Sequence, residues 1–380
     1  MNTLATATPP EQLLSIRTRP RVIEVIEPSL GLEGYLAVDS VRNGISFGGL
    51  RIDPSVSRSM VTDLSRRMSL KLAPHGAPVG GAKAGLKGSP TDARLARWLE
   101  VFARRCAGEL HNRTVLGKDM GASDAALATL YQNLDVPQLH VMGETTGKRA
   151  NETRIRELHG YRRHMTALGI AWSAGAVLAN RVRGRRVLIQ GFGAVGAGVA
   201  VRLDRLGAVI VGVSDRQRGL YHADGMPIEA LLGARTPGNE LDHERCRFPH
   251  EVIARDELFS ADADLLVLAA GSYLVDRAVA ARIRCPLVIE GANIGLKECA
   301  QAELHRRGVT VVPDVIANST SAALVGHQLA SGNTLTRREV WIRIRSSLET
   351  AVRRTLAHAE QAGISSHQAF NELFAPGNHR

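Results

Sequence analysis

The chain has 380 residues, 44% of them apolar, and a formal net charge of +11. This length suits about two domains that each bury their own core. No apolar run approaches the length of a membrane span, and residues 1–12 lack the basic start and apolar stretch of a signal peptide, so we expect a cytoplasmic protein without a membrane partner.

Charge and cysteine content argue against two kinds of site. Only six of the 48 basic residues are lysines, and the arginines form scattered pairs without interleaved aromatic residues. We therefore expect a solvated, arginine-rich surface and no nucleic-acid partner, because base stacking needs aromatic side chains. The cysteines show no CxxC or Cys/His spacing, which predicts reduced, buried thiols and no metal site. They are Cys106, Cys246, Cys285 and Cys299.

Three of the six lysines fall within seventeen residues, at Lys71, Lys83 and Lys87. Lysine is a compact charge whose pKa falls when it is desolvated or set beside another cation. Lys83 lies in the glycine-rich stretch 78–85, where the backbone can approach a ligand closely. The pattern favours chemistry at Lys71 and Lys83, and three solvated surface lysines are the alternative interpretation.

A dinucleotide-binding pattern follows. It consists of a strand (187–190), a GxGxxG turn (Gly191, Gly193 and Gly196), a helix (194–206), a second strand (209–213) and Asp215. The glycines allow a tight turn beside a pyrophosphate, the helix N-terminus offers unpaired N–H groups, and Asp215 has the spacing of a ribose-binding carboxylate. We predict NAD as the cofactor, with NADP possible because Arg216 follows directly. A glycine turn in another α/β sheet is the alternative.

Further short apolar strands are predicted at 265–268, 287–290 and 310–312, separated by helix-length segments. This alternation predicts an α/β fold with a doubly wound parallel sheet. Residues 1–145 form a separate α/β unit that carries the lysines. An amphipathic helix is predicted over 337–363, with one apolar stripe. The stripe contains Val340, Ile344, Leu348, Val352 and Leu356.

Seven motifs carry a family resemblance. They are Gly-Gly-Leu-Arg-Ile-Asp-Pro-Ser-Val (48–56), Met-Ser-Leu-Lys (68–71), Gly-Gly-Ala-Lys-Ala-Gly (80–85), Gly-Lys-Asp-Met-Gly (117–121), Gln-Gly-Phe-Gly-Ala-Val-Gly (190–196), Glu-Gly-Ala-Asn (290–293) and Pro-Asp-Val-Ile-Ala-Asn (313–318). In this order they resemble the glutamate/leucine/phenylalanine/valine dehydrogenase family. The resemblance implies oxidative deamination of an L-amino acid to a 2-oxo acid and ammonium by a homo-oligomer. It implies a substrate-binding and oligomerisation domain (1–145), a Rossmann NAD(P)-binding domain (146–325) and a C-terminal helical segment (326–380) that packs back toward the first domain.

The resemblance also implies residue roles. Lys71 binds the substrate α-carboxylate, Lys83 polarises the carbonyl and activates water, and Asp119 exchanges protons with the amino nitrogen; a helix N-cap before Ala122 is the alternative role for Asp119. The other implied substrate-binding residues are Phe47, Gly48, Gly49, Met68, Asn318, Ala322 and Val325. The implied cofactor-binding residues are His159, Gly191, Phe192, Gly193, Ala194, Val195, Gly196, Asp215, Ala269, Ala270 and Asn293.

Three positions bear on the substrate side chain. Phe47 stands where glutamate-specific relatives have a lysine that pairs with the side-chain carboxylate, and Val325 stands at the family's serine on an ungapped count. Met68 is as in leucine-type enzymes. A buried carboxylate without a partner is costly, so a branched or aromatic apolar substrate is favoured. Glutamate dehydrogenase is the alternative, with Arg51 as its first candidate cation.

The chain also departs from the family pattern. The usual Asn-Ala-Gly-Gly is replaced by Asn-Ser-Thr-Ser-Ala at 318–322, the family's Ala-Thr-Gly is Leu-His-Gly at 158–160, and Ala84 follows Lys83 where glycine is common. These changes indicate altered specificity or lost activity. A non-catalytic dinucleotide-binding regulatory homologue is the rival class. Retention of both lysines and Asp119 favours the enzyme, because a binding-only protein needs no proton-transfer group.

Overall fold

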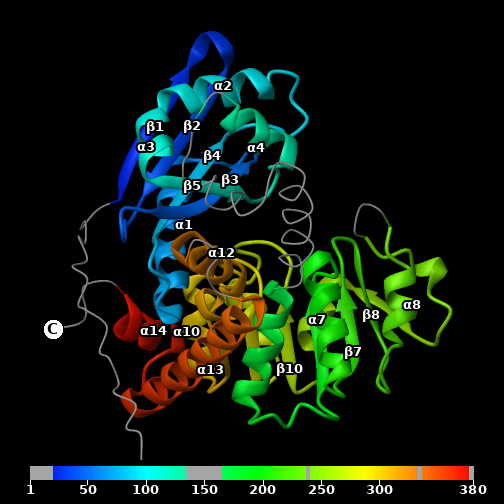
Figure 1. The fold of residues 1–380 in the computed structure, drawn as a ribbon. Helices are drawn as coiled ribbons and strands as arrows, with labels where there is room; N and C mark the ends of the chain where they lie inside the picture. The colour runs from blue at the N-terminus through cyan, green and yellow to red at the C-terminus, as the bar shows by residue number, and fades with distance from the viewer. Residues whose placement is uncertain (1–19, 133, 135–164, 237–239, 332–335, 376–380) are drawn as a thin grey trace, which may run out of the picture. The chain divides into compact units, whose positions relative to one another are not determined.

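The computed structural model describes residues 20–132, 134, 165–236, 240–331 and 336–375 (Figure 1). The chain divides into two compact units. The first comprises Met1–Ser69 and Pro78–Val136, and the second comprises Leu70–Ala77 and Pro137–Arg380. No helix within the described ranges is long and apolar enough to cross a lipid bilayer.

The first unit is built on a five-stranded sheet with the order β1-β2-β4-β3-β5. Its strands are β1 (Arg21–Glu27), β2 (Leu32–Val38), β3 (Ser46–Ile52), β4 (Gly80–Leu86) and β5 (Thr114–Lys118). β2 is antiparallel to β1 and β4, whereas β3 is parallel to β4 and β5. Its helices are α1 (Arg58–Leu72, whose last turn belongs to the second unit), α2 (Leu95–Arg105), α3 (Ala107–Asn112) and α4 (Asp124–Tyr131), with the short η1 (Pro28–Leu30).

Strand alternation gives this sheet two different faces. Leu50 of β3 and Leu86 of β4 point to one face and pack with Trp98 and Phe102 of α2 in a hydrophobic core. On the other face α1 lies directly against β4. A Cβ atom on Gly81 would be 2.2 Å from the backbone nitrogen of Ser69, so only glycine permits this approach.

The second unit contains a seven-stranded sheet with the order β12-β11-β10-β6-β7-β8-β9. Its strands are β6 (Arg186–Gln190), β7 (Val209–Ser214), β8 (Arg218–Tyr221), β9 (Glu251–Ala254), β10 (Leu265–Leu268), β11 (Leu287–Glu290) and β12 (Thr310–Val312). Helices line both faces. They are α7 (Ala194–Arg205), α8 (Ile228–Gly233), α9 (Arg277–Arg282), α10 (Glu298–Arg306), α11 (Asp314–Ala317), α12 (Thr320–Ser331), α13 (Arg337–Ala362) and α14 (Ser366–Phe374), with η2 (Ala73–His75), η3 (His243–Arg245), η4 (Arg255–Ser260) and helical residues 165–177.

Burial on both faces explains why these strands are continuous apolar runs. Val187 and Ile189 of β6 pack in one core with Val199 of α7, whereas Leu188 packs in another with Leu304 of α10. The predicted doubly wound α/β fold is confirmed, with five parallel strands from β12 to β7. The antiparallel edge strands β8 and β9 were not predicted.

The apolar stripe of α13 packs within the second unit. Ile344 packs with Met165 and Leu324, and Leu348 and Val352 join the core of the sheet. The sequence predicted that the C-terminal segment packs back toward the first domain. Within the described residues α13 also packs against η2, which belongs to the second unit, so the predicted packing toward the first domain stays a prediction.

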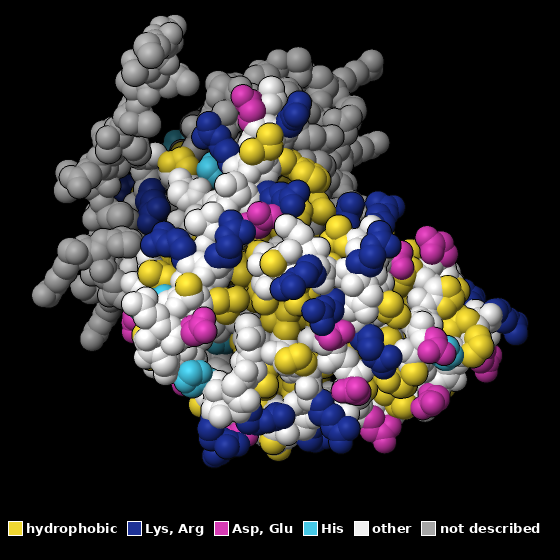
Figure 2. All heavy atoms as spheres, turned by 90° about the horizontal axis from the view of Figure 1, so that it is seen from below, with side chains coloured by type: hydrophobic (Ala, Val, Ile, Leu, Met, Phe, Trp, Pro, Cys, Tyr) yellow, Lys and Arg dark blue, Asp and Glu magenta, His cyan; other side chains and the backbone are white. Residues whose placement is uncertain are grey.

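The sequence predicted a solvated, arginine-rich surface and buried cysteine thiols. Figure 2 shows one face of the molecule, on which Lys and Arg side chains are scattered among acidic and hydrophobic ones. Members of several arginine pairs form ion pairs with carboxylates: Arg66 with Asp63, Arg105 with Glu27, Arg185 with Asp264 and Arg306 with Glu303. The thiols of Cys106, Cys246 and Cys285 are free and buried as predicted, but Cys299 is exposed, which corrects that prediction.

Candidate active site

One face of the first sheet forms a glycine-lined surface around Lys83. Phe47, Gly49 and Arg51 alternate with the core residues of β3, and Lys83 and Gly117 occupy the same face of β4 and β5. A Cβ atom on Gly49 would lie 3.3 Å from Lys83 Nζ. It would also lie 3.0 Å from Asp119 Cβ, so glycine lets the lysine ammonium group and Asp119 approach the backbone of β3 closely.

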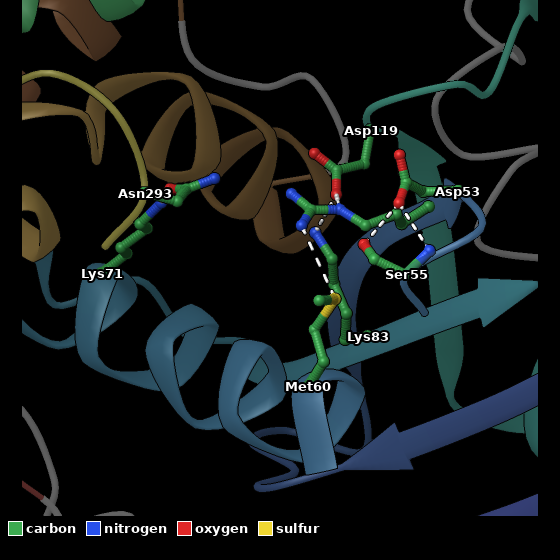
Figure 3. A network of polar contacts seen from close by, with 8 residues as sticks. Asp53, Ser55, Met60, Lys71, Lys83, Asp119 and Asn293 are labelled. Carbon is green, nitrogen blue, oxygen red and sulfur yellow. Dashed lines mark hydrogen bonds and ion pairs between the residues drawn. The ribbon is translucent and has the colours of Figure 1, made fainter. Parts of the chain in front are cut away.

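Lys83, Asp119 and Arg51 form a buried ion cluster (Figure 3). Asp119 Oδ2 lies 2.7 Å from Lys83 Nζ and 3.0 Å from Arg51 Nε, and the side chains of Lys83 and Arg51 are only 5% and 7% exposed. Burial by itself would raise the pKa of Asp119, but the charges of Lys83 and Arg51 and hydrogen bonds from Lys83 and the Met120 N–H outweigh it and hold the pKa well below its usual range. Two basic side chains thus share one carboxylate.

The position of Asp119 follows from β5. Its backbone N–H donates to the Leu50 carbonyl at 3.1 Å, which extends the pairing of β3 and β5 by one residue. The alternative role as a helix N-cap is wrong, because Ser123 caps α4 by accepting a hydrogen bond from the Ala126 N–H. The carboxylate of Asp119 is directed instead at Lys83 and Arg51.

A second set of polar residues lies in the second unit. Lys71, in the last turn of α1, donates to Asn293 Oδ1, which follows β11 (Figure 3). Asn318 Nδ2 donates to the same oxygen at 3.2 Å and to the Gly291 carbonyl at 3.2 Å. Within the described part of the chain, Asn318 Oδ1 is buried and accepts no hydrogen bond. An acceptor left open in this way is suited to a ligand N–H group.

The remaining predicted substrate residues differ in their packing and burial. Gly48 faces away from Lys83, and its Cβ would lie 1.8 Å from the Ala82 carbonyl oxygen, so this glycine is required by strand packing. Met68 on α1 and Val325 on α12 are buried, and Ala322 on α12 is partly buried. Lys87 is a surface residue, about half exposed, that pairs with Glu33 at 3.0 Å.

The GxGxxG turn has the geometry that a dinucleotide needs. Gly191 has φ +91°, and its Cβ would lie 2.6 Å from the Ala270 nitrogen, while a Cβ on Gly196 would lie 1.9 Å from the Gly191 carbonyl oxygen. Both positions therefore require glycine for packing. A Cβ on Gly193 would meet no atom within 4 Å, so open space lies before the N–H groups of the first turn of α7. A pyrophosphate fits such a site.

Other predicted cofactor residues contribute in different ways. The Phe192 ring is buried in the sheet core and Val195 packs against that core, so their backbone atoms are what they can offer a ligand, whereas Ala194 is exposed. Ala269 donates its N–H to the Gln190 carbonyl at 2.7 Å, which places the loop after β10 beside the glycine turn. His159 lies outside the described residues.

Asp215 follows β7 and binds its own loop. Its Oδ1 accepts the N–H groups of Gln217 and Arg218, and Oδ2 accepts that of Leu241 at 2.9 Å. Burial by itself would raise the pKa of Asp215, but these backbone hydrogen bonds outweigh it and lower the pKa, so the group is ionised at neutral pH. Among the described side chains, no group of three or more His, Cys, Asp or Glu residues could hold a metal ion.

A doubly wound parallel sheet with a GxGxxG turn before α7 is the architecture of a dinucleotide-binding domain. The sequence matches the family described as Glu/Leu/Phe/Val dehydrogenase, dimerisation domain, over residues 22–135, and Glutamate/Leucine/Phenylalanine/Valine dehydrogenase over residues 159–374. The chain therefore belongs to the glutamate/leucine/phenylalanine/valine dehydrogenase family and is an NAD(P)-dependent amino acid dehydrogenase that acts on CH–NH₂ donors.

Individual relatives agree with this assignment. The chain is 30% identical to the NADP-specific glutamate dehydrogenase of Saccharolobus shibatae over 334 residues, which cover 84% of this chain and 75% of the relative. It is also 30% identical to the NAD-specific glutamate dehydrogenase of Staphylococcus aureus over 332 residues, 84% of this chain and 78% of the relative. Among solved structures, the hetero-hexameric glutamate dehydrogenase from Thermus thermophilus in its Leu-bound form is 26% identical, with a TM-score of 0.73 and coverage of 93% and 86%.

Proposed function

We propose that this enzyme oxidatively deaminates an L-amino acid with a branched or aromatic apolar side chain. The observation that carries the proposal is the composition of the Lys83 face. Phe47, not a cation, lies on that face, and the cations Lys83 and Arg51 are both engaged by Asp119. A substrate side-chain carboxylate buried there would compete with Asp119 for its partners, whereas an apolar side chain would not.

In this proposal the substrate α-carboxylate pairs with Lys71, and Asn318 Oδ1 accepts a hydrogen bond from the substrate amino group. Asp119 accepts the proton that the amino group must lose. Its lowered pKa keeps it ionised and therefore free of a proton, and also makes it a weaker base than an ordinary aspartate. A dinucleotide held at the glycine turn would accept the Cα hydrogen of the substrate as a hydride, which leaves an imine. Lys83 orients a water molecule that adds to the imine carbon, and loss of ammonium then gives the 2-oxo acid.

The direct test is NADH or NADPH consumption with ammonium and a panel of 2-oxo acids corresponding to leucine, valine, phenylalanine, tryptophan and glutamate. We expect kcat/KM to be highest for an apolar 2-oxo acid. A Phe47→Lys variant is the matched probe, because it adds a cation to the same face and should shift activity toward 2-oxoglutarate. Highest activity of the wild type with 2-oxoglutarate would overturn the apolar assignment, and no turnover with any of them would favour the regulatory homologue.

Glutamate dehydrogenase is the second candidate. The relatives described above, named glutamate dehydrogenases, favour it. In that case Arg51 is the cation to test, because it lies two residues beyond Gly49 on the Lys83 face. Because Arg51 also pairs with Asp119, an Arg51→Met variant would lower turnover with every 2-oxo acid, and a role in binding glutamate would appear as an additional rise in the KM for 2-oxoglutarate.

We also propose a preference for NAD over NADP and a homo-oligomeric assembly. The ionised Asp215 would accept ribose hydroxyls and repel a 2′-phosphate, although the adjacent Arg216 opposes this effect. Oligomer formation is supported by the match of residues 22–135 to a dimerisation domain. Comparing kcat/KM for the two cofactors and measuring mass in solution test these two points.

A further inference from the structure

His75 links three segments of the second unit. Its Nδ1 atom lies 2.7 Å from the hydroxyl oxygen of Ser347 on α13, and its Nε2 atom lies 2.7 Å from the hydroxyl oxygen of Ser319. His75 and Ser319 are both buried. The ring is therefore held at both nitrogens, and it cannot turn without breaking at least one of these bonds.

The ring is neutral in the folded protein. Burial, with a smaller contribution from the charge of His327, lowers the pKa of His75 to about 3. The hydroxyl of Ser319 also lies within hydrogen-bonding distance of the Ile316 carbonyl, and that of Ser347 lies within reach of the Arg343 and Ile344 carbonyls. A neutral imidazole has one N–H donor and one acceptor nitrogen, so one serine accepts from the ring while the other turns its single O–H from the backbone carbonyl to the ring.

The contacts of His75 close a circuit around the proposed α-carboxylate site. Lys71 precedes His75 by one helical turn and donates to Asn293, which also accepts from Asn318. Asn318 is followed directly by Ser319, whose hydroxyl contacts His75. Ser319 also lies in the segment where this sequence departs from the family pattern. The circuit thus runs from Lys71 through Asn293, Asn318 and Ser319 back to the turn that carries Lys71.

We propose that His75 is a positioning residue for the amino-acid substrate. Through Ser319 it holds the turn that carries Lys71 against the segment that carries Asn318, and Ser347 fixes the ring in the required orientation. This inference rests on the proposed function of Lys71 and Asn318. If it holds, loss of the circuit weakens binding of the amino acid and leaves binding of the dinucleotide unchanged.

The experiment compares steady-state kinetics and thermal melting for Ser319→Ala, His75→Leu and His75→Gln in the full chain. We expect Ser319→Ala and His75→Leu to raise the KM for the amino acid about tenfold, as for the loss of a buried hydrogen-bond partner, with the KM for the dinucleotide unchanged. His75→Gln keeps one donor and one acceptor and should have a smaller effect. Ser346→Ala, at an exposed neighbour on α13, is the matched control.

If Ser319→Ala lowers Tm and leaves the KM for the amino acid unchanged, the contacts of His75 only stabilise the fold, and the proposal is overturned. If His75→Leu does not fold, Ser319→Ala and His75→Gln still decide the matter. Lys71→Ala separates the two levels of the argument. If Lys71→Ala raises this KM and Ser319→Ala does not, only the positioning role fails, whereas an unchanged KM in both removes the carboxylate site itself.

Discussion

Replacing Asp119 by asparagine tests the ion cluster of the first unit. Asp119 Oδ2 lies 2.7 Å from Lys83 Nζ and 3.0 Å from Arg51 Nε. An amide preserves size and one acceptor oxygen, but it removes the charge that balances two buried cations. Breaking a buried ion pair from one side costs about 3–5 kcal/mol. We expect a loss of about 3 kcal/mol, the lower end of this range, because the amide oxygen still accepts a hydrogen bond.

The effect of this substitution on stability should depend on pH. A loss of about 3 kcal/mol lowers Tm by on the order of 10 °C for a domain of roughly 100 residues. Because the folded pKa of Asp119 is depressed, its contribution to stability is fully present above the unfolded pKa of about 4 and is lost as the pH falls through the folded pKa. The melting temperatures of the wild type and the D119N variant should therefore differ most near neutral pH and converge in acid.

Kinetics give the second readout. Turnover of D119N should fall by about 10²–10⁴-fold, the usual contribution of a general acid–base group, while NADH binding measured by fluorescence stays unchanged. Asp53→Asn is the matched control, because this carboxylate follows β3 of the same sheet, as Asp119 follows β5, but binds the N–H and hydroxyl groups of Ser55. Turnover at the wild-type rate, or a difference in Tm that stays constant between neutral and acid pH, would refute the reasoning.

Other substitutions test the two sets of residues in the second unit. Gly193→Ala should leave Tm unchanged and weaken NADH binding. Gly196→Ala should instead lower Tm, because its Cβ would lie 1.9 Å from the Gly191 carbonyl oxygen. Differential scanning fluorimetry measures Tm, and fluorescence titration measures NADH binding. Lys71→Ala should raise the KM for the amino acid by about tenfold or more, as for the loss of a charged hydrogen-bond partner, and an unchanged KM would mean that another group holds the α-carboxylate. Asp215→Ala should reduce the ratio of kcat/KM for NAD to that for NADP, and an unchanged ratio would argue against contact with the ribose. The same variant should lower the free energy of unfolding by about 1–3 kcal/mol, because three backbone N–H groups lose their acceptor.

The fold could be predicted where burial is symmetrical. Strands such as β10 and β11 are buried on both faces, so they stand out in the sequence as short apolar runs between helix-length segments, and the predicted bounds 265–268 and 287–290 are confirmed. The edge strands β8 and β9 have the sequences Arg-Gly-Leu-Tyr and Glu-Val-Ile-Ala, with mixed burial. Four residues of this kind carry no distinct period, so the antiparallel edge could not be predicted.

The motifs of the site could be predicted from the sequence, but the side-chain contacts between distant residues could not. Strand alternation places Arg51 on the same face as Phe47, but nothing local to Arg51 indicates an aspartate 68 residues further along the chain. The contacts of His75 were equally hidden, because Ala-Pro-His-Gly reads as a turn and its partners Ser319 and Ser347 are 244 and 272 residues away. Pairings over such separations depend on how the elements pack, which the sequence pattern does not encode directly.

Asp215 has an observed structural role, to which we propose that binding of the ribose is added. The spacing after the glycine turn predicts a ribose-binding carboxylate, whereas the structure shows three backbone N–H groups bound to it. A carboxylate has about four acceptor positions, and Oδ1 uses two while Oδ2 uses one, so one position on Oδ2 stays available to a ribose hydroxyl. The backbone bonds fix this oxygen before the cofactor arrives, which lowers the entropy that binding must offset. The local fold and the proposed ribose contact therefore both call for a carboxylate at this position.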